Sequence, residues 1–209
     1  TNNAQGAGGD ADPKRIDSVT TRAKRFMRNR VAAGDPFFMQ LSHYAVHSEI
    51  QALPETREKY ADLPPGTRHT IGDYAAMTED LDTGVGMLLD KVDELGISDN
   101  TYVIYVSDNG GDKSRTLTTN VPLAKGKGAL HEGGIRVPMI VRGPDIQANS
   151  VSHVPVTTTD LFPTISDLLG VDAPYPEGLE GGSLQGILEN RGEGIVDRSR
   201  EALFWHFPH

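Results

Sequence analysis

The chain of 209 residues contains no cysteine, which fits either a reduced cytoplasm or a bacterial periplasmic protein without disulfides. It also lacks any apolar run of the roughly 20 residues that a helix needs to cross a bilayer, so we expect no membrane partner. The net charge is -9. Because nonspecific binding of nucleic acids needs clustered positive charge, we expect no nucleic-acid partner either.

The composition is otherwise that of a globular protein, with 37% hydrophobic and 23% charged residues. A chain of this length can bury one substantial core, so we expect one domain with at most the start of a second. Residues 1–12 contain no large apolar side chain and are predicted to form a flexible segment.

Residues 13–33 have the apolar spacing of an amphipathic helix, with Pro13 in its first turn and Gly34 at its end. The helix is rich in lysine and arginine, which is compatible with an anionic partner. A solvated helix face is the simpler interpretation.

Residues 71–95 form the clearest predicted helix, because an unbroken apolar stripe runs along them to a stop at Gly96. Thr70 and Asp73 are expected to cap its start. Residues 50–68, rich in proline, are predicted to form a loop with one helical turn.

Three short apolar runs predict β-strands, in residues 37–41, 101–106 and 137–141. The order of helix, tight loop and strand in residues 71–106 is that of an α/β unit. Open α/β sheets bind their ligands beyond the carboxyl ends of the strands. The residues that follow the first two strands are therefore candidates for a site.

The last part of the chain is predicted to hold two shorter helices, in residues 160–169 and 183–188, and a strand in residues 202–207. We interpret Asp82 and Asp160 as helix caps or buried hydrogen-bonding groups.

Residues 107–111 (SDNGG) place Asp108 and Asn109 directly after a predicted strand. A carboxylate and an amide oxygen at such a position can converge on one hard cation. Asp-Asn-Gly is also ordinary turn chemistry. The apolar strand before it and the lysine loop after it favour the metal site.

The long segment 110–132 is too rich in glycine for regular structure, and a loop of this length is usually functional. Within it, Lys127 stands between two glycines, so its backbone can approach an anion closely. Its point charge suits a tetrahedral oxyanion. On the residues alone, a solvent-exposed lysine without function is the competing interpretation.

Two histidines, His43 and His47, follow the first predicted strand. A helical pair that binds a metal is one interpretation of this spacing, but Pro36 and the apolar run favour strand and loop. An imidazole has a pKa near working pH, which suits general acid catalysis.

Together, residues 42–47, 107–111 and 125–138 resemble the type I sulfatases of the alkaline phosphatase superfamily, and the resemblance runs from about residue 35 to residue 209. It implies an α/β fold with a large mixed β-sheet flanked by helices, of which this chain holds the C-terminal portion. Residues 13–172 would be the C-terminal half of the catalytic domain, and residues 173–209 the start of a small C-terminal subdomain.

The resemblance implies roles for individual residues. Asp108 and Asn109 match calcium ligands of the family, Lys127 matches a lysine that contacts the sulfate, and His47 matches a histidine beside the leaving-group oxygen. Substrate contacts are expected from His43, Lys125 and His131. Glu49 replaces a proline of the family, which alters the expected loop geometry after His47.

The family's nucleophile is a formylglycine made from the first residue of a C/S-x-P-S/A-R motif, and these 209 residues contain no such motif. We therefore expect the chain to be the C-terminal part of a sulfatase, inactive alone, with calcium ligands and nucleophile completed by other residues. The strand predicted in residues 202–207 looks as though it continues beyond the last residue.

The predicted function is that of a sulfuric ester hydrolase acting on sulfated carbohydrates or aryl sulfates. One alternative is a phosphonate or phosphate monoesterase of the same superfamily, which would need more metal-binding Asp and His residues. Another is a non-catalytic remnant or binding module. We expect a periplasmic or secreted enzyme whose signal peptide would lie outside these residues, while the sequence leaves the oligomeric state open.

Overall fold

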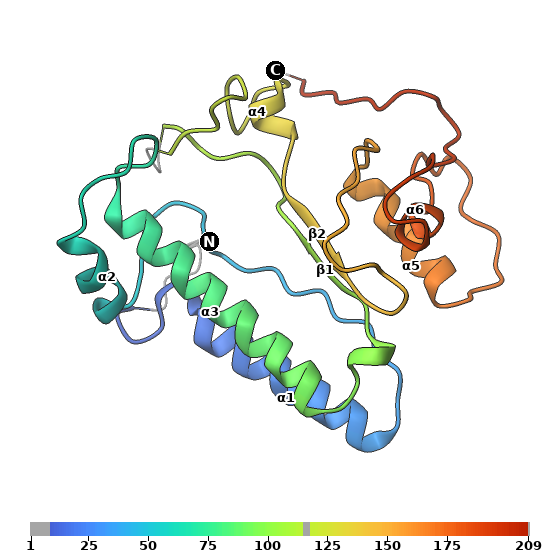
Figure 1. Ribbon diagram of the computed structural model, residues 1–209, viewed down its shortest axis with the longest axis horizontal. Helices are drawn as coiled ribbons and strands as arrows, with labels where there is room; N and C mark the ends of the chain where they lie inside the picture. The colour runs from blue at the N-terminus through green and yellow to red at the C-terminus, as the bar shows by residue number, and fades with distance from the viewer. Residues whose placement is uncertain (1–8, 115–117, 209) are drawn as a thin grey trace. The chain divides into compact units, whose positions relative to one another are not determined.

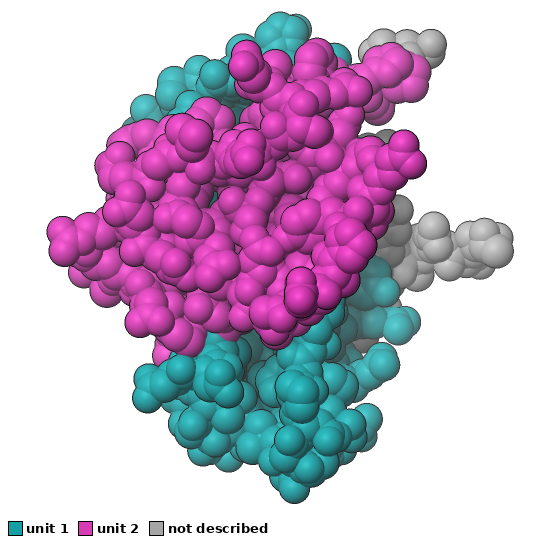
Figure 2. Space-filling model, turned by 90° about the vertical axis from the view of Figure 1, so that its right-hand side faces the viewer, with its two compact units in different colours: residues 1–101, 105–139 teal, residues 102–104, 140–209 magenta. Residues whose placement is uncertain are grey.

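A computed structural model describes residues 9–114 and 118–208 (Figure 1). Most of the predicted flexible segment, residues 1–8, lies outside the described residues. The chain divides into two compact units, which Figure 2 colours separately. Unit 1 comprises Thr1–Thr101 and Tyr105–Met139, and unit 2 comprises Tyr102–Ile104 and Ile140–His209. The domain boundary predicted at residue 172 does not coincide with this division and stays a prediction.

Helix α1 (Ile16–Ala33) confirms the first predicted helix. A 3-10 turn, Pro13–Arg15, leads into it, and the carboxylate of Asp12 accepts hydrogen bonds of 2.9 and 3.2 Å from backbone N–H groups in its first turn. These bonds satisfy donors that have no partner inside the helix. At the other end, Gly34 takes the left-handed conformation (φ 70°) that terminates many helices.

Helices α2 (Pro54–Ala61) and α3 (Gly72–Glu94) follow α1 in unit 1. The helical turn expected in residues 50–68 is thus a helix of 8 residues. Asp80 of α3 holds the start of α2, because its carboxylate accepts hydrogen bonds from Leu53 N (2.7 Å) and Thr56 Oγ1 (2.6 Å).

The core of this part is a cluster of buried Ala52, Ala76 and Met77, in which α3 packs on the segment before α2. Helix α3 also packs closely on α1, since a Cβ on Gly84 would lie 2.8 Å from Ile16 Cγ2. None of the helices among the described residues has both the length and the apolar character to cross a membrane.

The cap predicted for α3 is wrong, although the helix and its stop at Gly96 (φ 66°) are confirmed. Ile71 is the N-cap residue, and no side chain that the structure describes forms a capping hydrogen bond there. Asp73 instead forms an ion pair with Arg57 of α2 at 3.0 Å. Asp82 is exposed on α3, so its interpretation as a cap or buried group is also wrong.

Strands β1 (Val103–Val106) and β2 (Met139–Arg142) pair side by side in a two-stranded sheet (Figure 1). Both were predicted. The strands predicted in residues 37–41 and 202–207 are not formed, since a strand needs a hydrogen-bonded neighbour and none of the described residues pairs with them. Burial in residues 37–41 alternates as in a strand, and Phe38 is 63% exposed.

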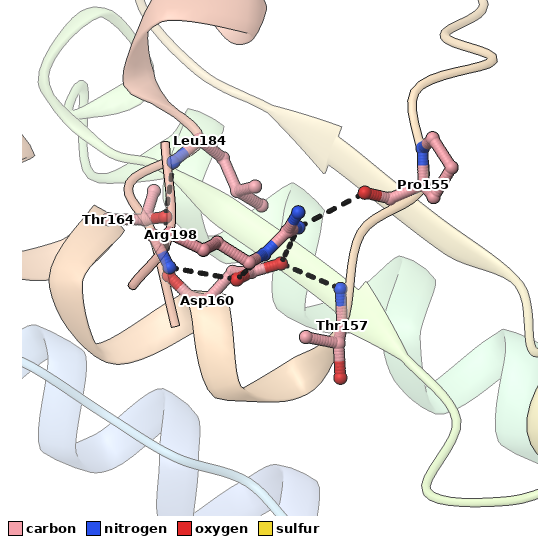
Figure 3. Close-up of polar contacts among 7 residues, drawn as sticks. Pro155, Thr157, Asp160, Thr164, Leu184 and Arg198 are labelled. Atoms are coloured by element: carbon pink, nitrogen blue, oxygen red, sulfur yellow. Dashed lines mark hydrogen bonds and ion pairs between the residues drawn. The ribbon is translucent and has the colours of Figure 1, made fainter. Parts of the chain in front are cut away.

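Unit 2 contains α5 (Leu161–Leu168), which follows the 3-10 turn Thr158–Asp160, and the short helix α6 (Gln185–Glu189). Both helices were predicted, as was the buried role of Asp160. This carboxylate is fully buried and pairs with Arg198 at 2.6 Å (Figure 3).

The backbone N–H groups of Thr157 (2.7 Å) and Gly182 (3.0 Å) also donate to Asp160. Burial alone would raise the pKa of Asp160, but Arg198 and these two N–H groups outweigh it, so the pKa lies below its ordinary value.

Candidate functional site

The side chains of Lys127 and His47 meet in unit 1. Lys127 Nζ lies 2.8 Å from His47 Nε2, and the other ring nitrogen, Nδ1, lies 2.7 Å from the carbonyl oxygen of Ser48. A carbonyl oxygen only accepts hydrogen bonds, so Nδ1 carries a hydrogen. In the neutral ring, Nε2 then accepts from the lysine ammonium. The contact therefore assigns both the orientation and the tautomer of His47.

Three glycine-rich segments hold Lys127 in place by backbone hydrogen bonds. The backbone N–H of Lys127 donates to Gly111 O at 3.1 Å, which ties the lysine loop to the turn after β1. Gly110 N donates to Gly134 O at 2.9 Å, and Gly133 N donates to Ala124 O at 2.9 Å. Gly133 and Gly134 belong to the short helix α4 (Glu132–Ile135), which the sequence did not predict.

Two of the glycines are needed because backbone segments touch there. A Cβ on Gly110 would lie 1.8 Å from Gly133 O, and a Cβ on Gly126 would lie 2.4 Å from Gly111 O. Either clash would push the segments apart, so the glycine content of this loop follows from its packing.

Asp108 and Asn109 follow β1 in the turn between the strand and these segments. Asp108 is exposed, and no hydrogen bond or ion pair within the described ranges engages its carboxylate. Asn109 Nδ2 donates to Gly110 O at 2.9 Å, which turns Nδ2 toward the backbone and leaves Oδ1 available. The pair thus offers the oxygen ligands that a hard cation prefers.

The donor set fits calcium only in part. Calcium takes about six to eight oxygen ligands, and the described residues contain no group of three or more His, Asp or Glu side chains that could hold a metal. Any metal bound to Asp108 and Asn109 would need further ligands from other residues.

Among the described residues, no hydrogen bond joins the side chains of the three expected substrate contacts to Lys127 or His47. Burial lowers the pKa of His43, which keeps its ring neutral, and neither ring nitrogen has a partner among the described residues. Lys125 and His131 are exposed, and they join the loop network through their backbone carbonyls. Their roles at the substrate stay predictions.

Sequence reasoning missed Asn120, whose side-chain amide lies between the turn after β1 and the lysine loop. It bonds to both backbone groups of Gly111 and to the carbonyl of Lys125. A single polar residue within a long irregular loop gives no periodic signal, so nothing in the pattern marked it.

Comparisons with known proteins identify the family of the chain. The family model described as Sulfatase matches residues 12–171. A sulfatase from Formosa agariphila is 36% identical over 213 residues, covering 95% of this chain and 38% of that protein. Steryl-sulfatase from Mus musculus is 31% identical, covering 90% of this chain and 29% of that protein. The chain thus spans between 29% and 38% of the length of these two relatives.

Among solved structures, the chain is similar to the crystal structure of Ps i-CgsB in complex with k-i-k-neocarrahexaose. The TM-score is 0.76 and the identity 32%, covering 84% of this chain and 38% of that one. The likeness confirms the predicted α/β fold of the alkaline phosphatase superfamily. Within the described residues of this chain, the sheet consists of the two strands β1 and β2.

Proposed function

The chain belongs to the sulfatase family, and on that premise we propose that it forms part of an enzyme that hydrolyses sulfate esters. The contact between Lys127 and His47 carries the proposal. It joins a cation suited to an oxyanion with a base that can exchange a proton. Cleavage of a sulfate ester requires both, the cation at the sulfate group and the proton donor at the leaving alcohol.

Lys127 binds the sulfate in this proposal. An ammonium group has three N–H donors, of which His47 Nε2 occupies one. No other described residue bonds to this ammonium group, so its other two donors can bind sulfate oxygens. There the positive charge offsets the negative charge that develops as the ester bond breaks.

His47 faces the leaving oxygen. Binding of a sulfate ester draws the ammonium of Lys127 toward the sulfate oxygens, which frees Nε2 to take a proton from solvent. Nδ1 keeps its hydrogen bond to Ser48 O, because both nitrogens of a protonated ring are donors. The ring then gives the Nε2 proton to the departing alkoxide and returns to the neutral tautomer.

Two groups outside these residues complete the site in our proposal. A formylglycine hydrate would supply the nucleophile that attacks sulfur. A calcium ion would be held partly by Asp108 and Asn109 and would neutralise sulfate charge. Neither the carboxylate of Asp108 nor Oδ1 of Asn109 has a hydrogen-bond partner within residues 9–114 and 118–208, which supports the second assignment.

We propose sulfated carbohydrates as the substrate class and the periplasm or extracellular space as the location. The similarity to Ps i-CgsB, whose crystal structure contains a neocarrahexaose, supports the substrate class. Aryl and steryl sulfates are the competing class, since relatives at 31% identity include a steryl-sulfatase.

The test begins with the coding DNA upstream of Thr1, where we expect a C/S-x-P-S/A-R motif. The protein that includes this segment is then assayed for sulfate release from carrageenan oligosaccharides, with K127A as the matched inactive control. Release that depends on Lys127 supports the proposal. Hydrolysis of phosphate monoesters in place of sulfate esters would favour the phosphate monoesterase instead. No hydrolysis of either substrate would favour the non-catalytic binding module.

A further inference from the structure

We propose that Asn120 is a positioning residue that keeps Lys127 against His47 by tying the turn after β1 to the lysine loop. The inference concerns the geometry of the chain itself, and only its kinetic arm rests on the proposed sulfatase function.

The side-chain amide of Asn120 makes three hydrogen bonds to backbone groups. Oδ1 accepts from Gly111 N at 3.1 Å, and Nδ2 donates to Gly111 O at 3.0 Å and to Lys125 O at 3.1 Å. One side chain thus forms hydrogen bonds with both backbone groups of Gly111, as a neighbouring strand would. It also bonds to the loop that carries Lys127.

The carbonyl of Gly111 is where this bridge meets Lys127. The oxygen accepts from Asn120 Nδ2 and from the backbone N–H of Lys127, at 3.0 and 3.1 Å. Loss of the amide would leave a single bond between Lys127 and the turn, and would leave Gly111 N and Lys125 O without this partner. An unsatisfied backbone group costs free energy, and here it would destabilise the turn after β1 and the lysine loop, which together set the position of Lys127.

The amide occupies space that two glycines leave open. A Cβ on Gly111 would lie 2.9 Å from Asn120 Oδ1, and a Cβ on Gly126 would lie 2.8 Å from Asn120 Nδ2. Shape and polarity are therefore both specified here. A carboxylate of the same size would keep the bond from Gly111 N, but its second oxygen would face the carbonyl oxygens of Gly111 and Lys125.

The backbone around Asn120 is fixed on its other side. Leu123 N donates to Asn120 O at 2.8 Å, and His69 Nδ1 lies 2.9 Å from Thr118 Oγ1. The residue is thus braced from the loop before α3 and can transmit this restraint to Lys127.

The variants N120A and N120D test the proposal, with T119A as the matched control. T119A removes a bond in the same loop, from Val121 N to Thr119 Oγ1 (3.2 Å), without touching the bridge. The first measurement uses the 209-residue chain with isotope-labelled histidine, in which the Nε2 resonance of His47 reports the contact with Lys127. K127A defines the position of that resonance when the contact is absent.

We expect N120A and N120D to move the Nε2 resonance toward its position in K127A, while T119A leaves it at the wild-type position. N120D keeps the size of the side chain and decides the question if N120A does not fold. Wild-type resonances in a folded N120D would overturn the proposal, and so would equal shifts in N120D and T119A.

The second measurement uses the catalytically complete protein. A misplaced lysine should lower kcat roughly tenfold to a hundredfold in N120A and N120D, with KM changed by less than about threefold. A rise in KM at constant kcat would overturn the positioning role. If the wild-type protein releases no sulfate, the proposed function fails, while the histidine resonances still decide the role of Asn120.

Discussion

Lys127 Nζ and His47 Nε2 lie 2.8 Å apart, although 80 residues separate them in the chain. The lysine reaches this position from a loop packed by glycines, and the histidine from the segment before α2. Because Nδ1 of His47 is held by Ser48 O, the lysine faces the only lone pair of the ring. The two side chains should therefore act as one unit.

Replacement of His47 should separate substrates by their leaving groups. If His47 protonates the leaving oxygen, H47A slows sugar sulfates, whose alkoxides are poor leaving groups, roughly a hundred- to ten-thousandfold more than aryl sulfates. The measurement is kcat/KM on both substrate classes with the catalytically complete protein.

H43A is the control for this comparison. His43 is partly buried with a lowered pKa, so its loss should reduce activity on both classes by similar factors. Equal losses on both classes in H47A would show that His47 only binds sulfate.

Replacement of Asp108 should remove calcium binding. In the complete protein, D108A loses a charged ligand and N109A loses a neutral one, so D108A should abolish the stabilisation by calcium and N109A should reduce it less. Calorimetric titration with calcium measures both. D82A, an exposed aspartate on α3, is the control with the same change of charge. Unchanged calcium affinity in D108A would remove this residue from the metal site.

The chain of 209 residues, assayed alone, should release no sulfate from an aryl sulfate above the rate of K127A. It contains no C/S-x-P-S/A-R motif, and removal of a covalent nucleophile abolishes several orders of magnitude in rate. Turnover by the wild-type chain that K127A abolishes would place a nucleophile within these residues.

The ion pair of Asp160 and Arg198 should make unit 2 sensitive to acid. The pKa of Asp160 lies below its ordinary value of about 3.9. The unfolded state therefore binds a proton at higher pH than the folded state. The pair contributes fully above the unfolded pKa, and its contribution declines from about pH 5 down to the lowered folded-state pKa.

Urea unfolding between about pH 3 and pH 7 measures this contribution. R198M leaves the buried carboxylate unpaired and should cost about 3–5 kcal/mol at neutral pH. R200A removes the exposed pair with Glu180 and should cost about 0–1 kcal/mol. A stability of R198M equal to that of R200A would contradict the structural role of Asp160.

The sequence predicted those elements whose signal is local. The stripe of α3 and the apolar run of β1 depend on nearby residues alone, so both were found, together with the position of Asp108 directly after the strand. The strands expected in residues 37–41 and 202–207 failed because pairing depends on a distant neighbour. The prediction that His47 and Lys127 belong to one site came from the family resemblance and not from the periodicity of the sequence.

Other features could not be predicted because they join single side chains to distant backbone. Asp80 holds the start of α2 from the middle of α3, where a buried aspartate has no pattern of its own. Asn120 bonds to Gly111, nine positions earlier in the chain, and no periodic pattern of the sequence marks this contact. Both contacts depend on how distant segments pack together, and residue propensities carry no information about that packing.

A double-mutant cycle on Lys127 and His47 tests the account most directly. Sulfate release from a carrageenan oligosaccharide is measured for the complete wild-type protein, K127A, H47A and the double variant. K127A should lose roughly a hundred- to a thousandfold in kcat/KM. Because the two side chains act as one unit, the double variant should lose little more than the worse single variant. Losses that multiply, or a wild-type protein that releases no sulfate, would contradict the account.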